Sequence, residues 1–188
     1  MKNYLDAVYE FPQEIACTVT GHRILERKFD TNILKSDLAE IIKSGYTVFN
    51  VGMAMGFDMA CFKALSELKK TYKNIKIVAC VPCKNQYEYY PQNIRAEYYE
   101  FLKIADKTYV LQESYDEFCM RNRNIFMVKN CSLVYSYMYK ISGGTYQTVR
   151  LASDYGKDIK SYGFSVNLNE TSSGSVMTEN NTEDNENK

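Results

Sequence analysis

The sequence predicts an α/β fold, a single domain in which a mostly parallel sheet is covered by helices on both faces. Short apolar segments alternate along the chain with segments whose apolar residues recur at helical spacing. The strand candidates are near-continuous apolar runs, which is typical of parallel strands buried on both faces. The chain has 188 residues, of which 45% are hydrophobic and 24% charged, and this composition suits one globular domain.

The first half of the chain contains three strand candidates that alternate with two helix candidates. Asp30 is a suitable N-cap for the first helix, which should end near Gly45. The second helix is expected over residues 57–72, with Met59, Phe62 and Leu65 on its apolar side. The strands of this half are expected over residues 15–19, 46–51 and 75–81.

The second half continues the alternation, and Gly156 marks the end of its last helix. Helices are expected over residues 93–105, 118–130 and 145–155. Strands are expected over residues 108–111, 132–137 and 159–164. The pattern as a whole predicts a Rossmann-like domain over residues 1–164.

The last segment, residues 165–188, has a different composition from the rest. It contains five acidic residues and one lysine, so that it carries a net charge of −4 and the remainder about +4, although the whole chain is neutral. It also has almost no residues that could be buried, so we expect a disordered acidic tail. Such a tail is either a solubilising appendage or a regulatory segment.

Four clusters of small, polar and basic residues stand at strand ends or at a helix start. They are Thr20–Arg23, Gly52–Asp58, Arg121–Asn124 and Ser142–Thr145. In a parallel sheet the carboxyl ends of the strands meet at one edge, so residues far apart in sequence can line one crevice. Glycines let backbone N–H groups approach a ligand there, and helix N-termini favour anions. Together the clusters predict a binding site for a phosphate-bearing small molecule.

Particular side chains suggest roles within this site. The Arg23 guanidinium can bind two phosphate oxygens, and His22, the only histidine, can serve acid–base chemistry or simply bond to the backbone of a turn. Asp58 is either a helix cap or a partner for a ribose hydroxyl, and it is the candidate catalytic residue. The expected ligand-binding residues are Gly21, His22, Arg23, Gly52, Met53, Ala54, Gly56, Asp58, Asn122, Arg123, Gly143, Gly144 and Thr145.

The cysteines and tyrosines suggest packing more than chemistry. Cys80 and Cys83 form a C-x-x-C pair, which could be redox-active or half of a zinc site, but two further zinc ligands are lacking. We therefore expect no metal and no cofactor. The tyrosines between residues 87 and 99 could stack on a base, although tyrosine-rich segments more often pack internally.

The clusters occur in the order seen in the YpsA-like branch of the SLOG superfamily, which the chain resembles from about residue 15 to residue 159. This resemblance rests on the four clusters together with Pro82–Gln86 and Met127-Val128. It implies a Rossmann-type domain related to the cytokinin-activating (LOG) phosphoribohydrolases and to the DNA-processing protein A fold. It also implies recognition or processing of nucleotide-derived ligands, including ADP-ribose-like molecules.

The resemblance has a departure that bears on catalysis. The phosphoribohydrolases carry a Pro-Gly-Gly-x-Gly-Thr-x-x-Glu motif, and Thr148 stands where its glutamate would be. Hydrolysis of an N-glycosidic bond normally uses a carboxylate, so binding of a nucleotide-type ligand is the leading hypothesis. A nucleoside 5′-monophosphate hydrolase that uses Asp58 is the alternative, and a scaffold or regulatory protein in cell division or stress is a further one.

Partners and location complete the expectations. The charge of about +4 on the folded part is too small to indicate nucleic acid as a partner. No run of about 18 apolar residues is present, and the first residues lack a signal-peptide pattern. We therefore expect a cytoplasmic protein without a membrane partner, and we leave homo-oligomer formation open.

Overall fold

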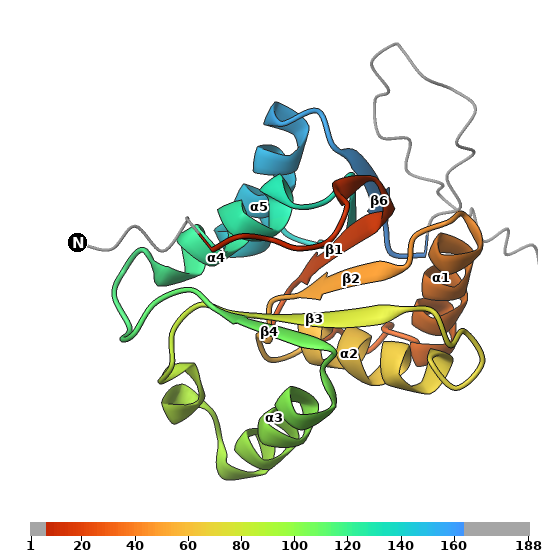
Figure 1. The fold of residues 1–188 in the computed structure, drawn as a ribbon. Helices are drawn as coiled ribbons and strands as arrows, with labels where there is room; N and C mark the ends of the chain where they lie inside the picture. The colour runs from red at the N-terminus through yellow and green to blue at the C-terminus, as the bar shows by residue number, and fades with distance from the viewer. Residues whose placement is uncertain (1–6, 164–188) are drawn as a thin grey trace, which may run out of the picture.

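The strands of the structure form one parallel sheet in the order β4-β3-β2-β1-β5-β6, with helices on both faces (Figure 1). The structure is a computed structural model that describes residues 7–163. Its architecture confirms the predicted Rossmann-like α/β fold. The expected acidic tail, residues 165–188, lies outside the described residues.

The helices and strands alternate along the described chain as the sequence predicts. The strands are β1 (Ala16–Gly21), β2 (Val48–Val51), β3 (Lys76–Val81), β4 (Lys107–Val110), β5 (Leu133–Tyr137) and β6 (Asp158–Ser161). The α-helices are α1 (Thr31–Lys43), α2 (Phe57–Leu68), α3 (Gln92–Ile104), α4 (Cys119–Lys129) and α5 (Gly143–Asp154). Two short 3₁₀ helices, η2 (Gln13–Ile15) and η3 (Gln86–Tyr89), precede β1 and α3.

The strand order determines which helices share a face. The chain steps from β1 to β4 in one direction, and right-handed crossovers then place α1, α2 and α3 together. It next crosses back to β5 and continues in the opposite direction, which places α4 and α5 on the other face. The direction reverses between β1 and β5, and ligands of open α/β sheets bind beside the carboxyl ends of the strands at such a point.

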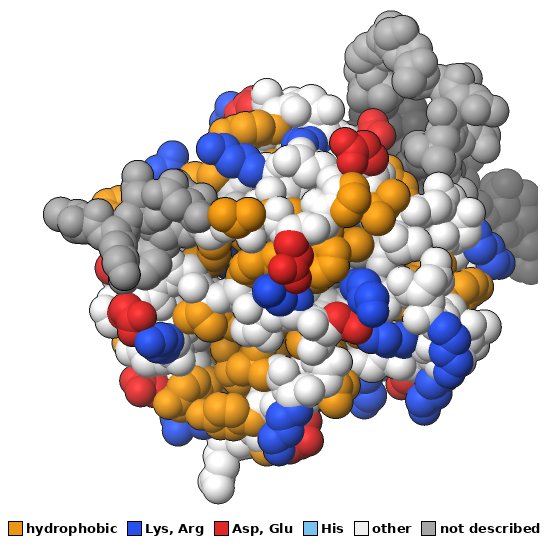
Figure 2. Space-filling view, viewed as in Figure 1, with side chains coloured by type: hydrophobic (Ala, Val, Ile, Leu, Met, Phe, Trp, Pro, Cys, Tyr) orange, Lys and Arg blue, Asp and Glu red, His pale blue; other side chains and the backbone are white. Residues whose placement is uncertain are grey.

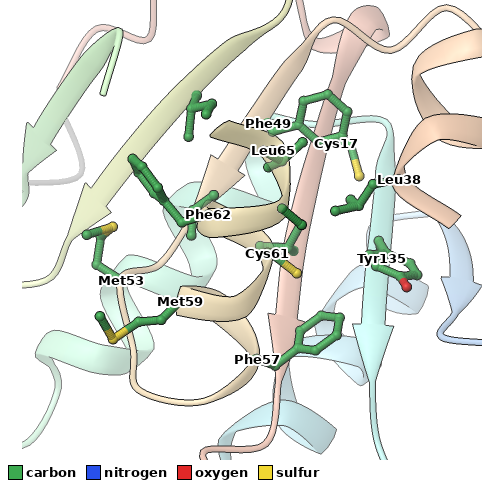
Figure 3. Close-up of a cluster of buried hydrophobic side chains, with 14 of the residues drawn as sticks. Cys17, Leu38, Phe49, Met53, Phe57, Met59, Cys61, Phe62, Leu65 and Tyr135 are labelled. Atoms are coloured by element: carbon green, nitrogen blue, oxygen red, sulfur yellow. The ribbon is translucent and has the colours of Figure 1, made fainter. Parts of the chain in front are cut away.

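Two hydrophobic clusters fill the space between the sheet and its helices. The larger cluster lies under α1, α2 and α3, and Figure 3 shows Phe49 of β2 with Phe62 and Leu65 of α2 within it. The smaller one lies under α4 and α5 and includes Val78 and Cys80 of β3. Neighbouring residues of β3 thus belong to different clusters, which explains why the strand is a continuous apolar run.

The predicted boundaries differ from the structure in two instructive places. Helix α2 ends at Leu68 rather than residue 72, because the following residues form tighter turns in which Lys70 N–H donates to Glu67 O and Thr71 N–H to Leu68 O. Helix α5 begins at Gly143 rather than residue 145. Because glycine is a poor helix former, the sequence analysis predicted that the helix begins only after the two glycines.

The described surface carries charges of both signs. On the face shown in Figure 2, lysines and arginines are interspersed with acidic and hydrophobic side chains. None of the helices in the described part combines the length and the apolar character needed to cross a membrane.

Candidate functional site

A cavity of about 370 Å³ lies at the carboxyl ends of β1 and β5, where the strand order reverses. This volume falls within the range of about 300–1,000 Å³ that is usual for small-molecule sites. The loop after β1, the loop after β2, helix α4, the segment after β5 and the start of α5 all contribute to its wall. Its lining residues are Val19, Thr20, Gly21, His22, Arg23, Ile24, Ala54, Asp58, Met120, Arg123, Asn124, Met127, Tyr139, Lys140, Gly144, Thr145 and Thr148.

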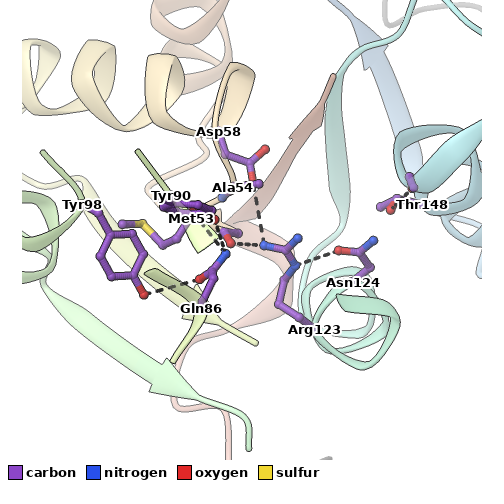
Figure 4. A network of polar contacts seen from close by, with 11 residues as sticks. Met53, Ala54, Asp58, Gln86, Tyr90, Tyr98, Arg123, Asn124 and Thr148 are labelled. Carbon is purple, nitrogen blue, oxygen red and sulfur yellow. Dashed lines mark hydrogen bonds and ion pairs between the residues drawn. The ribbon is translucent and has the colours of Figure 1, made fainter. Parts of the chain in front are cut away.

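A buried ion pair stands at one side of this cavity. Arg123 Nη1 of α4 lies 3.8 Å from Asp58 Oδ2 of α2, and both side chains are less than 10% exposed. Arg123 also donates from Nη1 to the carbonyl oxygen of Gly52 and from Nε to Asn124 Oδ1 at 2.7 Å (Figure 4). Arg123 was predicted to bind the ligand, but its guanidinium group already has partners within the protein.

Asp58 holds the glycine loop and does not cap its own helix. Its Oδ2 accepts a hydrogen bond from the backbone N–H of Ala54 at 3.2 Å, whereas the N-cap of α2 is Gly56. Burial raises the pKa of Asp58 to about 6, even though Arg123, the Ala54 N–H and Arg23 all act in the opposite direction. A carboxyl group that titrates near neutral pH is thus part of the cavity wall.

The loop between β2 and α2 needs its glycines for steric reasons. A Cβ atom on Gly52 would collide with the Arg123 guanidinium and with the Asp58 carboxylate. Gly56 has a φ of +80°, and a Cβ there would collide with the backbone carbonyl of Arg23. Met53 also adopts a left-handed conformation, with φ of 58°. The loop is therefore fixed in shape by its neighbours.

Tyrosines hold the loop from its other side. Tyr90 Oη and Gln86 Nε2 both donate to the Met53 carbonyl, at 2.9 and 3.3 Å, and Tyr98 Oη contacts Gln86 Oε1 at 3.4 Å (Figure 4). Tyr90 and Tyr98 are buried. These two tyrosines thus support the loop instead of offering a surface for a base, while Tyr89 and Tyr99 are exposed.

The only histidine connects the loops after β1 and β5. His22 Nε2 accepts a hydrogen bond from the Lys140 backbone N–H at 3.2 Å, and its ring lies 4.2 Å from that of Tyr139 between centroids. Partial burial and the charge of Lys140 lower the pKa of His22, which favours the neutral acceptor form at neutral pH. The geometry matches the backbone-bonded alternative, since Nε2 already has a partner.

The structure brings eight of the predicted ligand-binding residues to the cavity wall and leaves five outside it. The eight are Gly21, His22, Arg23, Ala54, Asp58, Arg123, Gly144 and Thr145. Gly52, Met53 and Gly56 shape the loop behind the wall, and Gly143 lines the neighbouring cavity between α4 and α5. Asn122 lies on α4 but does not line the cavity.

Several residues of the cavity escaped the sequence analysis. Lys140 is exposed and lines the cavity, as the exposed Arg23 does, with its Nζ 5.5 Å from the centre of the Tyr139 ring. Lys140 follows β5 in a segment that has no glycine, and the sequence analysis relied largely on glycines to find the loops of the site. Asn124 and Thr148 also line the cavity. The sequence analysis named them within motifs but did not predict that they bind the ligand.

The cysteines do not form a metal centre in the described residues. All six are free and buried, with Cys80 inside β3 and Cys83 in the turn that follows. Within residues 7–163 no three histidine, cysteine or acidic side chains gather as a metal site would require. Burial raises the pKa of the Cys80 thiol to about 12, so this thiol is poorly reactive.

Comparison with solved structures shows that two DNA processing proteins have a similar fold. The chain is similar to DNA processing protein A from Streptococcus pneumoniae, with 20% identity and a TM-score of 0.59, over 88% of this chain and 54% of that one. It is also similar to DNA processing protein A from Helicobacter pylori, with 18% identity and a TM-score of 0.60, over 91% of this chain and 72% of that one. The chain thus spans about half the length of the pneumococcal protein.

These likenesses show the fold, and they correct one expectation. The Helicobacter pylori protein binds single-stranded DNA. The expectation that nucleic acid is an unlikely partner is therefore wrong, because a small net charge does not make nucleic acid unlikely for a domain of this fold.

Comparison by sequence identifies the family. A search of curated proteins found no significant match. The family model YpsA, described as the YspA SLOG family, matches residues 19–158. This range runs from the end of β1 to the start of β6 and includes every cluster from which the cavity is built. The chain therefore belongs to the YpsA family of SLOG proteins.

Proposed function

We propose that the protein binds a nucleotide or a nucleotide-derived ligand, such as an ADP-ribose-like molecule, in the cavity between β1 and β5. One observation carries the proposal: two exposed cations, Arg23 and Lys140, flank a cavity whose wall also contains the first turn of α5. The N–H groups of a helix's first turn have no partner within the helix, and they favour an anion. This combination suits a phosphate group.

The remaining wall can accommodate the other parts of a nucleotide. Asp58 is the carboxylate of the wall and can accept a hydrogen bond from a ribose hydroxyl. The Tyr139 ring, which is packed against His22, offers an aromatic face for a base. Arg123 contributes little additional attraction, because Asp58 offsets its charge.

The phosphate requirement gives the sharpest test. We expect AMP and ADP-ribose to raise the melting temperature of the full chain and adenosine to leave it unchanged. A ligand at 100 times its dissociation constant stabilises a protein by about 2.7 kcal/mol, which is readily measured. Arg23→Ala and Lys140→Ala should each weaken AMP binding about tenfold, the loss of one charge-assisted contact. Equal shifts by adenosine and AMP would overturn the proposal.

A matched control separates the site from general charge effects. Lys63 is an exposed cation on α2, on the opposite face of the sheet from α4 and α5. Lys63→Ala removes one positive charge without touching the cavity, so AMP affinity should not change. If it weakens AMP binding as much as Arg23→Ala does, the ligand does not occupy this cavity.

Single-stranded DNA is a second candidate ligand, favoured by the activity of the Helicobacter pylori protein. A strand would present the same phosphate chemistry to Arg23 and Lys140. Competition decides between a shared and a separate site. AMP should displace a bound oligonucleotide if both use the cavity, whereas a strand that AMP does not displace requires another surface.

Hydrolysis of the N-glycosidic bond has one supporting observation, the Asp58 carboxyl group in the cavity wall with a pKa near neutrality. Release of free adenine from AMP measures this activity directly. If the protein is a hydrolase, Asp58→Asn should abolish adenine release and retain AMP binding. If the unaltered protein releases no adenine, hydrolysis of AMP at this site is ruled out.

A further inference from the structure

We propose that the ligand extends out of the first cavity, and that a second phosphate-bearing nucleotide unit lies in the groove between α4 and α5. This inference rests on the function proposed above and specifies the class of ligand. The groove encloses about 520 Å³, which is again within the usual range for a small-molecule site. Its lining residues are Arg121, Asn124, Ile125, Gly143, Tyr146, Gln147, Thr148, Arg150, Leu151 and Asp154.

The groove is continuous with the first cavity. Asn124 of α4 and Thr148 of α5 line both, and the adjacent residues Gly143 and Gly144 line the groove and the cavity respectively. The start of α5 therefore forms a common border. A ligand whose first phosphate binds at this helix start can pass directly into the groove.

Both walls of the groove carry positive charge. Arg121 belongs to the first turn of α4 and Arg150 to the second turn of α5, and both are exposed. Within residues 7–163 neither lies within 4.0 Å of a carboxylate oxygen. Two cations without an internal partner on facing helices suit an anionic ligand.

The groove also offers an aromatic surface. The Arg150 guanidinium lies 6.0 Å from the centre of the Tyr146 ring, and both residues line the groove. A base can stack on such a ring or on a guanidinium plane. Asp154 is the one acidic residue of the groove wall, and it lies one helical turn beyond Arg150, away from the shared border. The second phosphate is therefore expected between the border and Arg150.

This arrangement selects ligands with two nucleotide units joined through phosphate. Such a ligand can be a phosphodiester dinucleotide or a pyrophosphate-linked molecule. Calorimetric titration of the full chain with AMP, 5′-phosphorylated ApA (pApA) and diadenosine diphosphate (AppA, two AMP units joined by a pyrophosphate) distinguishes them. We expect pApA to bind about tenfold more tightly than AMP. A similar gain for AppA would extend the preference to pyrophosphate linkages, and a gain for pApA alone would restrict it to phosphodiesters.

Removal of the groove cations supplies the decisive comparison. Arg121→Ala and Arg150→Ala should each weaken pApA binding about three- to tenfold, the range for one exposed charged contact to a phosphate. AMP affinity should change less than about twofold in both variants, and Lys63→Ala should affect neither ligand. Because both arginines are exposed, the variants should fold with unchanged melting temperatures.

Two results would overturn the inference, and they are distinguishable from failure of the proposed function. If AMP binds but pApA gains nothing over it, the groove is not a subsite and the proposed function stands. If pApA gains affinity that both arginine variants retain, the second unit lies elsewhere. If AMP, ADP-ribose and pApA all fail to bind, the proposed function fails, and this inference fails with it.

Discussion

Arg123 and Asp58 join the two helical layers of the protein at the carboxyl edge of the sheet. Arg123 belongs to α4 on one face and Asp58 to α2 on the other, yet Nη1 and Oδ2 are 3.8 Å apart and both side chains are buried. The pair also fixes the backbone of the glycine loop, through Gly52 O and Ala54 N–H. The same contacts that stabilise the fold therefore shape one side of the cavity.

Loss of Arg123 should destabilise the protein strongly. Arg123→Met removes one partner of a buried ion pair and leaves the Asp58 carboxylate without compensation, which typically costs about 3–5 kcal/mol. Adding Asp58→Asn should recover part of this loss, since it removes the unpaired charge. Urea unfolding measures both effects. Arg121→Met is the control on the same helix, and because Arg121 is exposed its effect should stay within about 0.5 kcal/mol.

Asp58 should make stability depend on pH in the acidic range. Its pKa is about 6 in the folded protein and 3.8 as the ordinary value, so between these values the folded state holds a proton that the unfolded chain has lost. The free energy of unfolding should therefore fall as pH rises through this window, by at most about 3 kcal/mol at about 1.4 kcal/mol per pKa unit. Above about pH 6 Asp58 is ionised in both states, and the free energy of unfolding should not fall further because of it.

The Asp58→Asn variant isolates this contribution. It lacks the titrating carboxyl group, so its free energy of unfolding should be flatter than that of the unaltered protein between about pH 4 and pH 6. The difference between the two proteins also cancels the contribution of other groups that titrate in this range. Parallel pH profiles would mean that Asp58 is already ionised at low pH and that Arg123 outweighs its burial.

Gly52 should tolerate no side chain. In Gly52→Ala the new Cβ would meet Arg123 Nη1 and Asp58 Oδ2, so the ion pair must separate, and overpacking of this kind costs about 1–3 kcal/mol. Gly144→Ala is the matched control, because open space surrounds that position and it lies within α5. There alanine should be neutral or stabilise by up to about 1 kcal/mol. Equal melting temperatures for the two variants would contradict the crowding at Gly52.

The fold could be predicted from the sequence because its signals are local. Buried parallel strands are continuous apolar runs, and Asp30 caps α1 as expected, with its side chain accepting from the Asn32 N–H at 2.7 Å. The errors lie at the ends of elements. Glycines and tightened turns decide the helix boundaries, and β6 ends at Ser161 rather than at residue 164, while β2 begins at Val48 rather than at residue 46. The strand order, and with it the place of the cavity between β1 and β5, depends on contacts between distant segments that no local pattern reports.

For the site, the sequence could predict which loops take part but not how their side chains pair with one another. The four clusters do supply most of the cavity wall, because a parallel sheet brings its strand ends to one edge. The pairing of Asp58 with Arg123 could not be foreseen, since it depends on how α2 and α4 approach each other around the sheet. The sequence analysis therefore assigned Arg123 to ligand binding, and it did not name Lys140 as a residue of the site.

Thr148 provides the last test of where the phosphate binds. It is buried, lines both cavities and donates from Oγ1 to the Gly144 carbonyl at 2.8 Å. Thr148→Glu would place a carboxylate beside the start of α5, where we expect the phosphate. Thr148→Gln has the same size and no charge, so it controls for crowding. At neutral pH the Glu variant should bind AMP at least about tenfold more weakly than the Gln variant, because like charges at short range repel.

Calorimetric titration of both variants measures this ratio. Equal affinities for AMP would show that the phosphate does not approach the first turn of α5, and the site would then have to be reassigned to the Arg23 side of the cavity.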